Sequence, residues 1–466
     1  MYKQSVTFFL TLLLFGTIFC SNEAPLKLAV LGLGGRSNYL LLDCLKLTKN
    51  IQVVAVCDDN AHQSFDFFVN KLLIEGKDTD PYKKLFANAI FYPDSMQGLQ
   101  TLFENHKDID QILITSANYH HSSHLKAALA YSPCKKIFIE KPLFRNLQEF
   151  TDFNLQDSES EILIGLTLRY SSMARIVVEK LQKHQKSLGT LKSVKAWERI
   201  RFSQALTSFM MSWRRYISLS GGLLLEKSIH DLDLALFFIQ SLEGTSEDVH
   251  IRTQVAHNFF TNSHKQTIIN EVLSNESLKK GLIRRDLSAF QRIINFSFNV
   301  DESIDWTATI DAIFAEFPES DDFTTSDIIP DYHRLNATIN TRNGTTIDFE
   351  LEVELGGFRT ETIRGMNFVF EHGRVEIDVM KSILLITFDS GEVFEFDLLT
   401  NNTDHADGDI CIAKTILGLP AEEHYTATFN DPVVQLATLL GLLSEQQALM
   451  HSEDDVYIKM LNFGIR

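Results

Sequence analysis

The stretch that decides the fold is Leu26-Lys-Leu-Ala-Val-Leu-Gly32-Leu-Gly34-Gly35-Arg36-Ser37-Asn38. It reads as a short apolar strand that enters a glycine-rich turn and then a helix. Gly32 permits the tight turn, and Gly34 lets the backbone approach a pyrophosphate, which the N–H groups at the helix start then bind. Ser37 replaces a third glycine, so we expect the helix to lie slightly less close to the strand. The stretch therefore predicts a dinucleotide-binding α/β domain.

An acidic residue ends the second predicted strand. Val53–Cys57 is followed by Asp58, roughly where a ribose-binding carboxylate is expected. A carboxylate there accepts hydrogen bonds from the ribose hydroxyls and repels a 2′-phosphate, which favours NAD over NADP. The alternative is an ordinary turn aspartate after a generic strand. The predicted cofactor-binding residues from these two segments are Gly32, Gly34, Gly35, Arg36 and Asp58.

Strands alternate with helices through the first third of the chain. We predict helices over 61–74, 95–105 and 121–131, between strands at 27–31, 53–57, 89–92, 112–115 and 136–140. This alternation is typical of a doubly wound parallel sheet, the Rossmann fold. A further strand at 161–167 is expected to continue the sheet. We place the NAD(P)-binding domain at residues 26–145.

The pattern changes after about residue 170. Helices are predicted at 173–187, 223–240 and 430–450, and long alternating strands at 192–200, 334–342, 346–354, 359–370, 374–379, 384–387 and 393–398. These elements predict an α+β domain over 146–466 with a large, mainly antiparallel sheet, which would bind substrate and mediate oligomerisation. Residues 242–330 are acidic and are expected to form an irregular insertion.

The first 25 residues have the pattern of a signal peptide. Lys3 precedes an almost entirely apolar run over 6–20, shorter than the roughly 20 residues that span a bilayer. This predicts a protein that is secreted or held in the secretory pathway or periplasm. The alternative is an uncleaved membrane anchor. No other segment is long and apolar enough to span a membrane, so we expect no membrane insertion after signal removal.

Composition excludes several classes of partner. The net charge of -18 argues against nucleic acid and anionic membrane surfaces. The five cysteines are scattered without a Cys-x-x-Cys motif, so we expect no structural zinc site and predict no metal at all. The cysteines are expected to be small buried residues rather than a disulfide framework.

Five further segments resemble, in order, the glucose–fructose oxidoreductase/inositol dehydrogenase (Gfo/Idh/MocA) family. They are Ile112–His121, with Ala117 where the family has proline, Ile137–Leu143 with its Glu-Lys-Pro signature, Gly165–Tyr170, Ser220–Asp233 and His405–Asp409. The resemblance runs from residue 27 to about 450. It implies cofactor contacts from Thr115, Asn118, His121, Glu140 and Lys141, and substrate contacts from Arg169, Tyr170, Asp233 and His405. Trp213, Arg214 and Arg215 are further candidates, although the arginines are equally compatible with surface ion pairs.

The predicted catalytic helix carries Glu226, His230 and Asp233 at i, i+4 and i+7, hence on one helical face. Oxidation of a secondary alcohol requires removal of the hydroxyl proton, which His230 can accept near neutral pH. Lys141 would polarise the substrate oxygen, and Glu226, usually aspartate in the family, would position one or both. The alternatives are a buried structural histidine, a metal pair of Glu226 and His230, and a surface lysine.

These observations predict an NAD(P)-dependent oxidoreductase that transfers hydride between the nicotinamide and a sugar, cyclitol or related polyol. An export signal would place it where free NAD is scarce, so we expect a tightly retained cofactor. Two other functions remain open: a glycosidase that uses NAD for transient redox chemistry, and a secreted binding protein of the same fold without catalysis. The broad C-terminal sheet suggests a homodimer or higher homo-oligomer.

Overall fold

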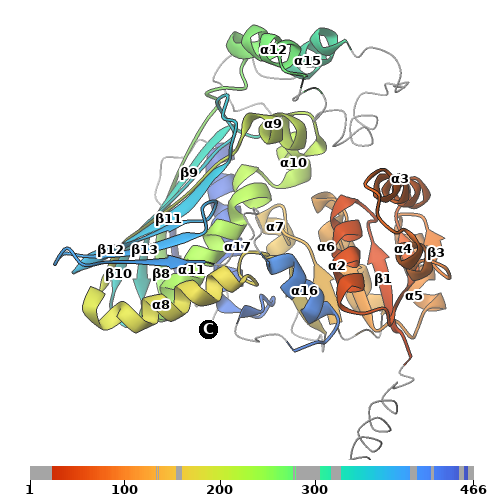
Figure 1. Cartoon of the computed structure of the whole chain (residues 1–466), viewed down its shortest axis with the longest axis horizontal. Helices are drawn as coiled ribbons and strands as arrows, with labels where there is room; N and C mark the ends of the chain where they lie inside the picture. Colours follow the sequence, from red (N-terminus) through yellow and green to blue (C-terminus); the bar gives the residue numbers. More distant parts are fainter. Residues whose placement is uncertain are drawn as a thin grey trace, which may run out of the picture.

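A parallel sheet forms the N-terminal part of the chain (Figure 1). The computed structural model describes residues 24–132, 134, 136–153, 160–276, 279, 305–315, 327–398, 407–420, 425–450 and 456–459. All six strands of this sheet are parallel, in the order β3-β2-β1-β4-β5-β6. They are β1 (Leu26–Leu31), β2 (Ile51–Cys57), β3 (Ile90–Tyr92), β4 (Gln111–Ile114), β5 (Lys136–Ile139) and β6 (Glu161–Ile164).

Helices cover both faces of this sheet, because its strands are buried runs that need apolar partners on each side. They are α2 (Gly35–Leu47), α3 (Ala61–Ile74), α4 (Asp80–Leu85), α5 (Met96–Asn105), α6 (Asn118–Tyr131) and α7 (Leu147–Thr151). Strand order reverses between β1 and β4, so the loops that follow these two strands diverge and leave the crevice in which such folds bind ligands. The predicted Rossmann fold is confirmed, and its sheet extends to Ile164, beyond residue 145.

The second sheet has nine strands in the order β14-β13-β12-β11-β7-β10-β9-β8-β15. Every neighbouring pair is antiparallel except β7 and β10. The predicted mainly antiparallel sheet is therefore confirmed. Its strands are β7 (Leu191–Arg199), β8 (Ser246–Ala256), β9 (Tyr332–Thr341), β10 (Thr346–Glu354), β11 (Ile363–Phe370), β12 (Gly373–Asp378), β13 (Ile383–Phe388), β14 (Val393–Asp397) and β15 (Val456–Lys459).

One expectation about this domain is wrong. Within the supposedly irregular segment 242–330, residues 246–256 form β8, which pairs with β9 over its length. Its inward residues Val249 and Ile251 alternate with exposed His250 and Arg252. The acidic composition of the surrounding sequence hid this alternation.

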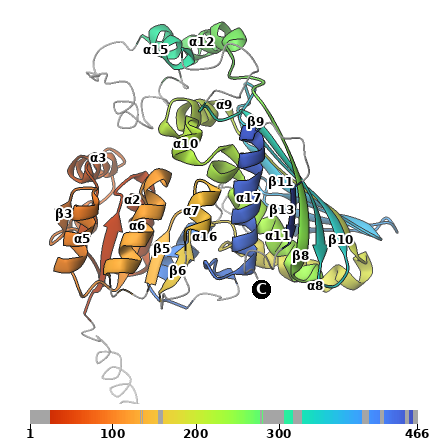
Figure 2. The ribbon, with the colours of Figure 1, turned by 180° about the vertical axis from the view of Figure 1, so that it is seen from behind.

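Long helices cover one face of the second sheet and also join the two domains. Among them, α11 (Ile229–Glu243) and α17 (Pro432–Met450) lie side by side against the strands (Figures 1 and 2). Helix α16 (Gly408–Ile416) packs on α2 and so brings the C-terminal part of the chain back to the glycine-rich turn. The remaining helices are α8 (Ser172–Leu188), α9 (Phe202–Gln204), α10 (Ile217–Ser220), α12 (Lys265–Ser274) and α15 (Trp306–Phe314), with short turns η1 (Ala205–Met210), η2 (Trp213–Arg215), η3 (Leu224–Ser228) and η4 (Asn262–His264).

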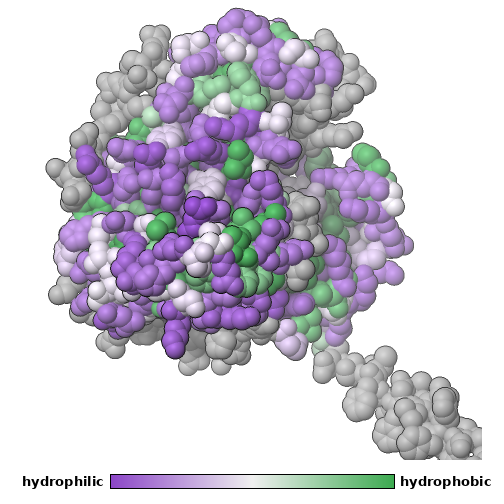
Figure 3. Space-filling view, turned by 60° about the vertical axis from the view of Figure 1, so that its left-hand side comes forward, coloured by the Kyte–Doolittle hydropathy of each residue, from purple (hydrophilic) through white to green (hydrophobic). Residues whose placement is uncertain are grey.

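The surface seen in Figure 3 is mainly hydrophilic, with small separate hydrophobic areas. Among the described residues, no helix combines the length and the hydrophobicity needed to cross a membrane. Cys44, Cys57 and Cys134 are buried free thiols, and Cys411 is half-buried. The predicted signal segment lies almost wholly outside the described residues, so it stays a prediction.

Candidate active site

The glycine-rich turn between β1 and α2 has the geometry that a dinucleotide needs. Gly32 has a φ of +91°, and a Cβ built there would lie 2.3 Å from Ser116 Cα, so the position admits only glycine. A Cβ on Gly34 or Gly35 would meet no described atom within 4 Å. The first glycine thus permits close packing of two loops, and the other two leave the backbone open to a ligand.

The start of α2 offers unoccupied hydrogen-bond donors. Its N-cap is Gly34, which has no side chain, and its first turn holds no acidic residue. The first backbone N–H groups of the helix and the positive end of its dipole therefore favour a phosphate group. Ser37, in place of the third glycine, is buried and donates from Oγ to the Gly34 carbonyl oxygen at 2.9 Å. This bond holds the turn without closing its open side.

Asp58 lies against the base of the same turn. Its Oδ2 accepts a hydrogen bond from the Leu33 N–H at 2.9 Å, and its Oδ1 accepts one from the Asn60 N–H at 2.7 Å. Thr115, at the end of β4, donates from Oγ1 to the Gly32 carbonyl oxygen at 2.7 Å. The carboxylate is half-buried and keeps lone pairs for further donors. These residues fit a dinucleotide whose ribose lies beside Asp58.

Arg36 connects the turn to the second domain. Its Nε lies 2.6 Å from Glu140 Oε1, and its Nη1 lies 2.7 Å from Asp409 Oδ1 at the start of α16. The sequence predicts that Arg36 and Glu140 bind the cofactor, and the structure joins them to each other. Their contact with the cofactor stays a prediction. Asp409 had no assigned role, and only its place in the His405–Asp409 segment signalled it.

Lys141, directly after β5, lies in a mixed-charge cluster between the domains. Its Nζ is 3.6 Å from Glu226 Oε2 and also donates to the Glu226 carbonyl oxygen. Glu226 accepts from Asn118 Nδ2 at 2.7 Å and from Arg214 Nε at 2.6 Å. Asn118 also donates to the Ser220 carbonyl oxygen at 2.7 Å. Two predicted catalytic residues and one predicted cofactor residue are therefore brought together, and Arg214 joins them.

Burial and charge set the protonation of this cluster. Burial lowers the pKa of Lys141 from its usual value, Glu226 opposes that shift, and the nearby charge of Arg214 adds to it. Burial alone would raise the pKa of Glu226, but Lys141, Arg214 and Asn118 together lower it. The site therefore holds a fixed carboxylate beside a lysine that releases its proton more readily than an exposed one.

The predicted continuous helix over 223–240 is interrupted. Leu224–Ser228 forms a π-helical turn, and α11 begins only at Ile229. A π turn holds more residues than an α turn, so the i, i+4, i+7 spacing does not put Glu226 on the same face as His230 and Asp233. Glu226 contacts Lys141, whereas Asp233 contacts Arg169. His230 lies between Glu226 and Asp233 in the sequence, in the first turn of α11, and its side chain is buried with 6% exposure.

Charged residues around His230 hold this segment in place. Lys227 pairs with Glu198 at 2.8 Å, and Asp231 binds Arg364 at 2.7 Å. All of these side chains are at most about one-eighth exposed. Buried pairs of this kind fix the register of a helix, because removing either partner leaves an uncompensated charge. The segment that carries Glu226 and His230 is thus anchored on both sides.

Three predicted substrate residues have internal partners in this structure. Arg169 and Asp233 form a fully buried ion pair, and Tyr170 donates to the Ala427 carbonyl oxygen at 3.1 Å. His121, predicted to contact the cofactor, is buried with Nδ1 2.7 Å from the Pro142 oxygen and Nε2 3.0 Å from the Ser116 oxygen. These contacts support neighbouring loops, and ligand contacts by these residues stay predictions. His405 lies outside the described residues.

Comparison with known proteins identifies the N-terminal domain. Residues 26–157 match the model of the oxidoreductase family with an NAD-binding Rossmann fold, Gfo/Idh/MocA. The N-terminal domain therefore belongs to the Gfo/Idh/MocA oxidoreductase family. No curated protein matches the chain.

Solved structures with the same fold include enzymes and a regulator. Levoglucosan dehydrogenase in complex with NADH and levoglucosan shares 12% identity at a TM-score of 0.58, over 93% of this chain and 99% of that one. An oxidoreductase from Agrobacterium radiobacter in complex with NAD+, L-tartaric acid and magnesium shares 12% identity at a TM-score of 0.54, over 93% of this chain and 98% of that one. The transcriptional regulator Gal80p from Kluyveromyces lactis shares 14% identity at a TM-score of 0.55, over 94% of this chain and 92% of that one. At these identities the likeness shows the fold alone.

Proposed function

We propose that this protein is an NAD-dependent dehydrogenase that oxidises a CH–OH group of a sugar, cyclitol or related polyol. The observation that carries the proposal is the cluster of Lys141, Glu226, Asn118 and Arg214. It lies beyond the carboxyl end of β5, at the sheet edge that also carries the glycine-rich turn. Levoglucosan dehydrogenase, solved with NADH and levoglucosan, shows that this fold can hold a nicotinamide cofactor, and it motivates the choice of substrates to screen.

Each residue of this site has a separate role in alcohol oxidation. The bound nicotinamide supplies the acceptor for hydride. Lys141 donates a hydrogen bond to the substrate oxygen and stabilises its developing negative charge. His230 accepts the hydroxyl proton, since imidazole titrates near neutral pH. Glu226 holds the Lys141 ammonium group by charge and is itself fixed by Asn118 and Arg214.

Asp58 supports NAD as the cofactor rather than NADP. Its half-buried carboxylate, bonded to the Leu33 N–H, would repel a 2′-phosphate close to the turn. We expect replacement of Asp58 by serine to lower the preference for NAD over NADP. The mass of nucleotide released by denaturing the purified protein tests both cofactor identity and the tight retention that we propose. Free exchange of added NAD would contradict retention.

The decisive test compares two lysines of the same strand region. Lys141→Met removes the proposed electrophile, whereas Lys136→Met removes a partly exposed lysine at the start of β5 that lies 3.8 Å from Glu161. Reduction of the bound NAD to NADH is followed in single turnovers over a panel of sugars, cyclitols and polyols. We expect the rate of this reduction to fall about 10²- to 10⁴-fold in the first variant and to be unchanged in the control. Full activity of the Lys141 variant would refute the assignment.

Product analysis separates this function from the other two. Net NADH supports a dehydrogenase, whereas a cleaved sugar without net redox change identifies a glycosidase. Gal80p shows that this fold is also used by a transcriptional regulator, so the fold does not by itself imply catalysis. Protein that releases no nucleotide on denaturation and also binds no added NAD in calorimetry would be a binding protein.

We further propose an exported homodimer. The signal-like pattern of residues 1–25 supports export, and detection of processed protein outside the cytosol tests it. The second sheet leaves a broad face along β7, β8, β9 and β10 that can meet a second copy. The mass measured by light scattering tests the dimer.

A further inference from the structure

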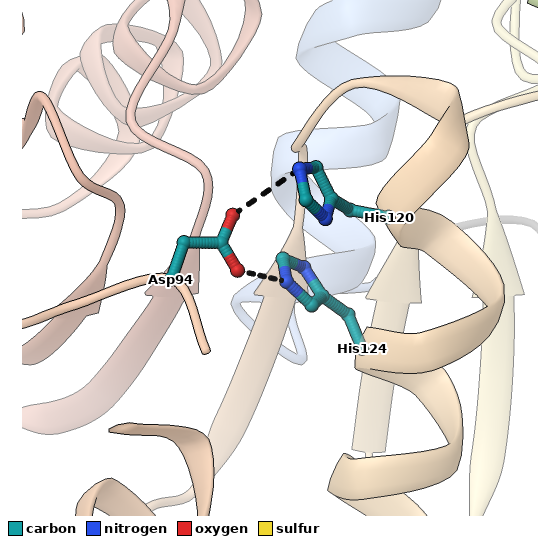
Figure 4. A group of neighbouring side chains, drawn as sticks. All are labelled: Asp94, His120 and His124. Carbon is teal, nitrogen blue, oxygen red and sulfur yellow. Dashed lines mark hydrogen bonds and ion pairs between the residues drawn. The ribbon is translucent and has the colours of Figure 1, made fainter. Parts of the chain in front are cut away.

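Two histidines and an aspartate converge at the edge of the first sheet (Figure 4). Asp94 follows β3, and His120 and His124 lie one turn apart on α6. Asp94 Oδ1 is 2.8 Å from His124 Nε2, and Asp94 Oδ2 is 3.6 Å from His120 Nε2. One donor atom from each of the three residues lies within 4.8 Å of the others. No role in the proposed oxidation uses these side chains.

Neighbouring groups orient the donors. His124 Nδ1 lies 3.1 Å from Ser116 Oγ, which leaves Nε2 directed at Asp94. This matches the arrangement of metal-ligating histidines, whose second ring nitrogen is held by a hydrogen bond. The Asp94 N–H donates to Asp59 Oδ1 at 2.8 Å, which fixes the loop that carries the carboxylate. The rings of His120 and His124 stack at 5.3 Å between centroids with 15° between their planes.

The cluster is enclosed on one side and open on the other. The side chains of His124 and Asp94 are 1% and 14% exposed, whereas that of His120 is 34% exposed. An ion can therefore enter beside His120, and solvent can supply a further ligand there.

We propose that Asp94, His120 and His124 form a binding site for a divalent transition metal ion of the zinc type. Imidazole nitrogens and one carboxylate are ordinary ligands of Zn²⁺, at about 2.0–2.2 Å. A tetrahedral ion with such bonds separates its ligand atoms by roughly 3.3–3.6 Å. The contact of 2.8 Å between Asp94 Oδ1 and His124 Nε2 must open to admit an ion, whereas Asp94 Oδ2 already lies 3.6 Å from His120 Nε2. One donor atom from each residue lies within 4.8 Å of the others, so the side chains are near the required separation.

A metal here joins the loop after β3 to helix α6. Ser116, which contacts His124, also packs closely against Gly32. A Cβ built on Gly32 would overlap Ser116. The ion therefore stabilises the support of the glycine-rich turn, a structural role that does not depend on the enzymatic proposal. The scattered cysteines and the Glu226 and His230 pair led to the expectation of no metal, although His120-x-x-x-His124 has the i, i+4 spacing of helical ligands.

The test uses the full chain after treatment with a chelator. Zn²⁺ is titrated in a calorimeter, and Co²⁺ is added to record the visible absorption of the bound ion. We expect one ion per chain, with affinity reduced at least about 100-fold in Asp94→Asn and His120→Gln, more than is typical for loss of an outer-shell partner. The matched control is His62→Gln, which removes an exposed histidine of the same domain whose ring contacts Phe91 at a tilt of 36°.

A second measurement separates ligand loss from misfolding. The metal-induced rise in melting temperature is taken for each variant against the same variant without metal, so any change in basal stability cancels. The wild type and the His62 variant should show the rise, and the Asp94 and His120 variants should not. Two results would overturn the site: no ion bound by the wild type, or equal binding by all four proteins.

Discussion

Arg169 and Asp233 form an ion pair that solvent does not reach, since both side chains are 0% exposed. Arg169 Nε lies 2.8 Å from Asp233 Oδ2, another guanidinium nitrogen binds Asp233 Oδ1, and a third binds Asp431. Burial raises the pKa of Asp233 to about 6, although Arg169 opposes this. The pair connects the segment after β6 to α11. Arg169, which the family resemblance assigns to substrate binding, therefore stabilises the packing of these two segments.

The first prediction concerns this pair. Arg169→Met leaves a buried carboxylate without its cation, which should lower the free energy of unfolding by about 3–5 kcal/mol. Arg374→Met is the control, because that side chain is 61% exposed and its loss should be nearly neutral. Both are measured by urea unfolding. Unchanged stability together with a raised KM would instead assign Arg169 to the substrate.

The second prediction separates two glycines of one turn. Gly32→Ala forces a Cβ onto Ser116 at a φ of +91°, so it should destabilise the domain by roughly 1–3 kcal/mol or more. Gly34→Ala has a φ of -98° and open space at its Cβ, so it should fold normally. Its methyl group would project to where the pyrophosphate binds, and NAD affinity should fall at least about tenfold.

Thermal unfolding and NAD calorimetry on both variants check this prediction. The informative protein is Gly34→Ala, since its stability serves as its own control. If it binds NAD as tightly as the wild type, the pyrophosphate does not lie over this turn.

Local features of this fold were predictable from the sequence. The strands of the first sheet are apolar runs that the parallel architecture buries on both faces, and the glycine-rich turn is specified by neighbouring residues. The strands at 334–342 and 346–354 alternate strictly, which one buried face produces. These elements were predicted correctly because the controlling interactions lie within one element, although the similar alternation in β8 was missed.

Contacts between distant segments were not predictable in the same way. Arg36 meets Asp409 across 373 positions, and nothing near either residue indicates the partner. The π turn at Leu224–Ser228 moved Glu226 off the expected face, because α-helical spacing was assumed throughout. Arg214 was named from the sequence as a substrate contact or surface ion-pair residue, and only the folded structure shows that it pairs with Glu226 beside Lys141.

The third prediction is that two variants shift the pH profile of activity in opposite directions. Loss of the Lys141 proton should end activity on the alkaline side, at a pH below that of an exposed lysine, because burial lowers its pKa. Glu226→Gln removes the charge that opposes this shift, so the alkaline limb of kcat/KM should move to lower pH by about 1–3 units. Arg214→Met removes a positive charge that repels the Lys141 ammonium group, so the alkaline limb should move to higher pH. Movement of both variants in the same direction would contradict the assignment.

The fourth prediction concerns stability and two buried groups near the start of η3. Glu445 accepts from the Leu224 N–H at 2.5 Å and lies 3.6 Å from His333 Nδ1. Burial raises the pKa of Glu445 to about 8 and lowers that of His333 to about 3. Both side chains are therefore neutral at pH 7, and their contact is not an ion pair.

The two groups give opposite pH dependences. The unfolded chain releases the Glu445 proton near pH 4.3 and the folded protein only near 8, so this group lowers stability as pH rises between those values. His333 lowers stability as pH falls from about 6.5 towards 3. The two effects oppose each other below about pH 6.5, so between pH 6.5 and 8 only Glu445 changes the stability.

The free energy of unfolding of Glu445→Gln should therefore rise relative to that of the wild type by about 2 kcal/mol from pH 6.5 to 8, at about 1.4 kcal/mol per pH unit. Urea unfolding of both proteins at the two pH values measures the difference. A constant difference would show that Glu445 is already ionised in the folded protein.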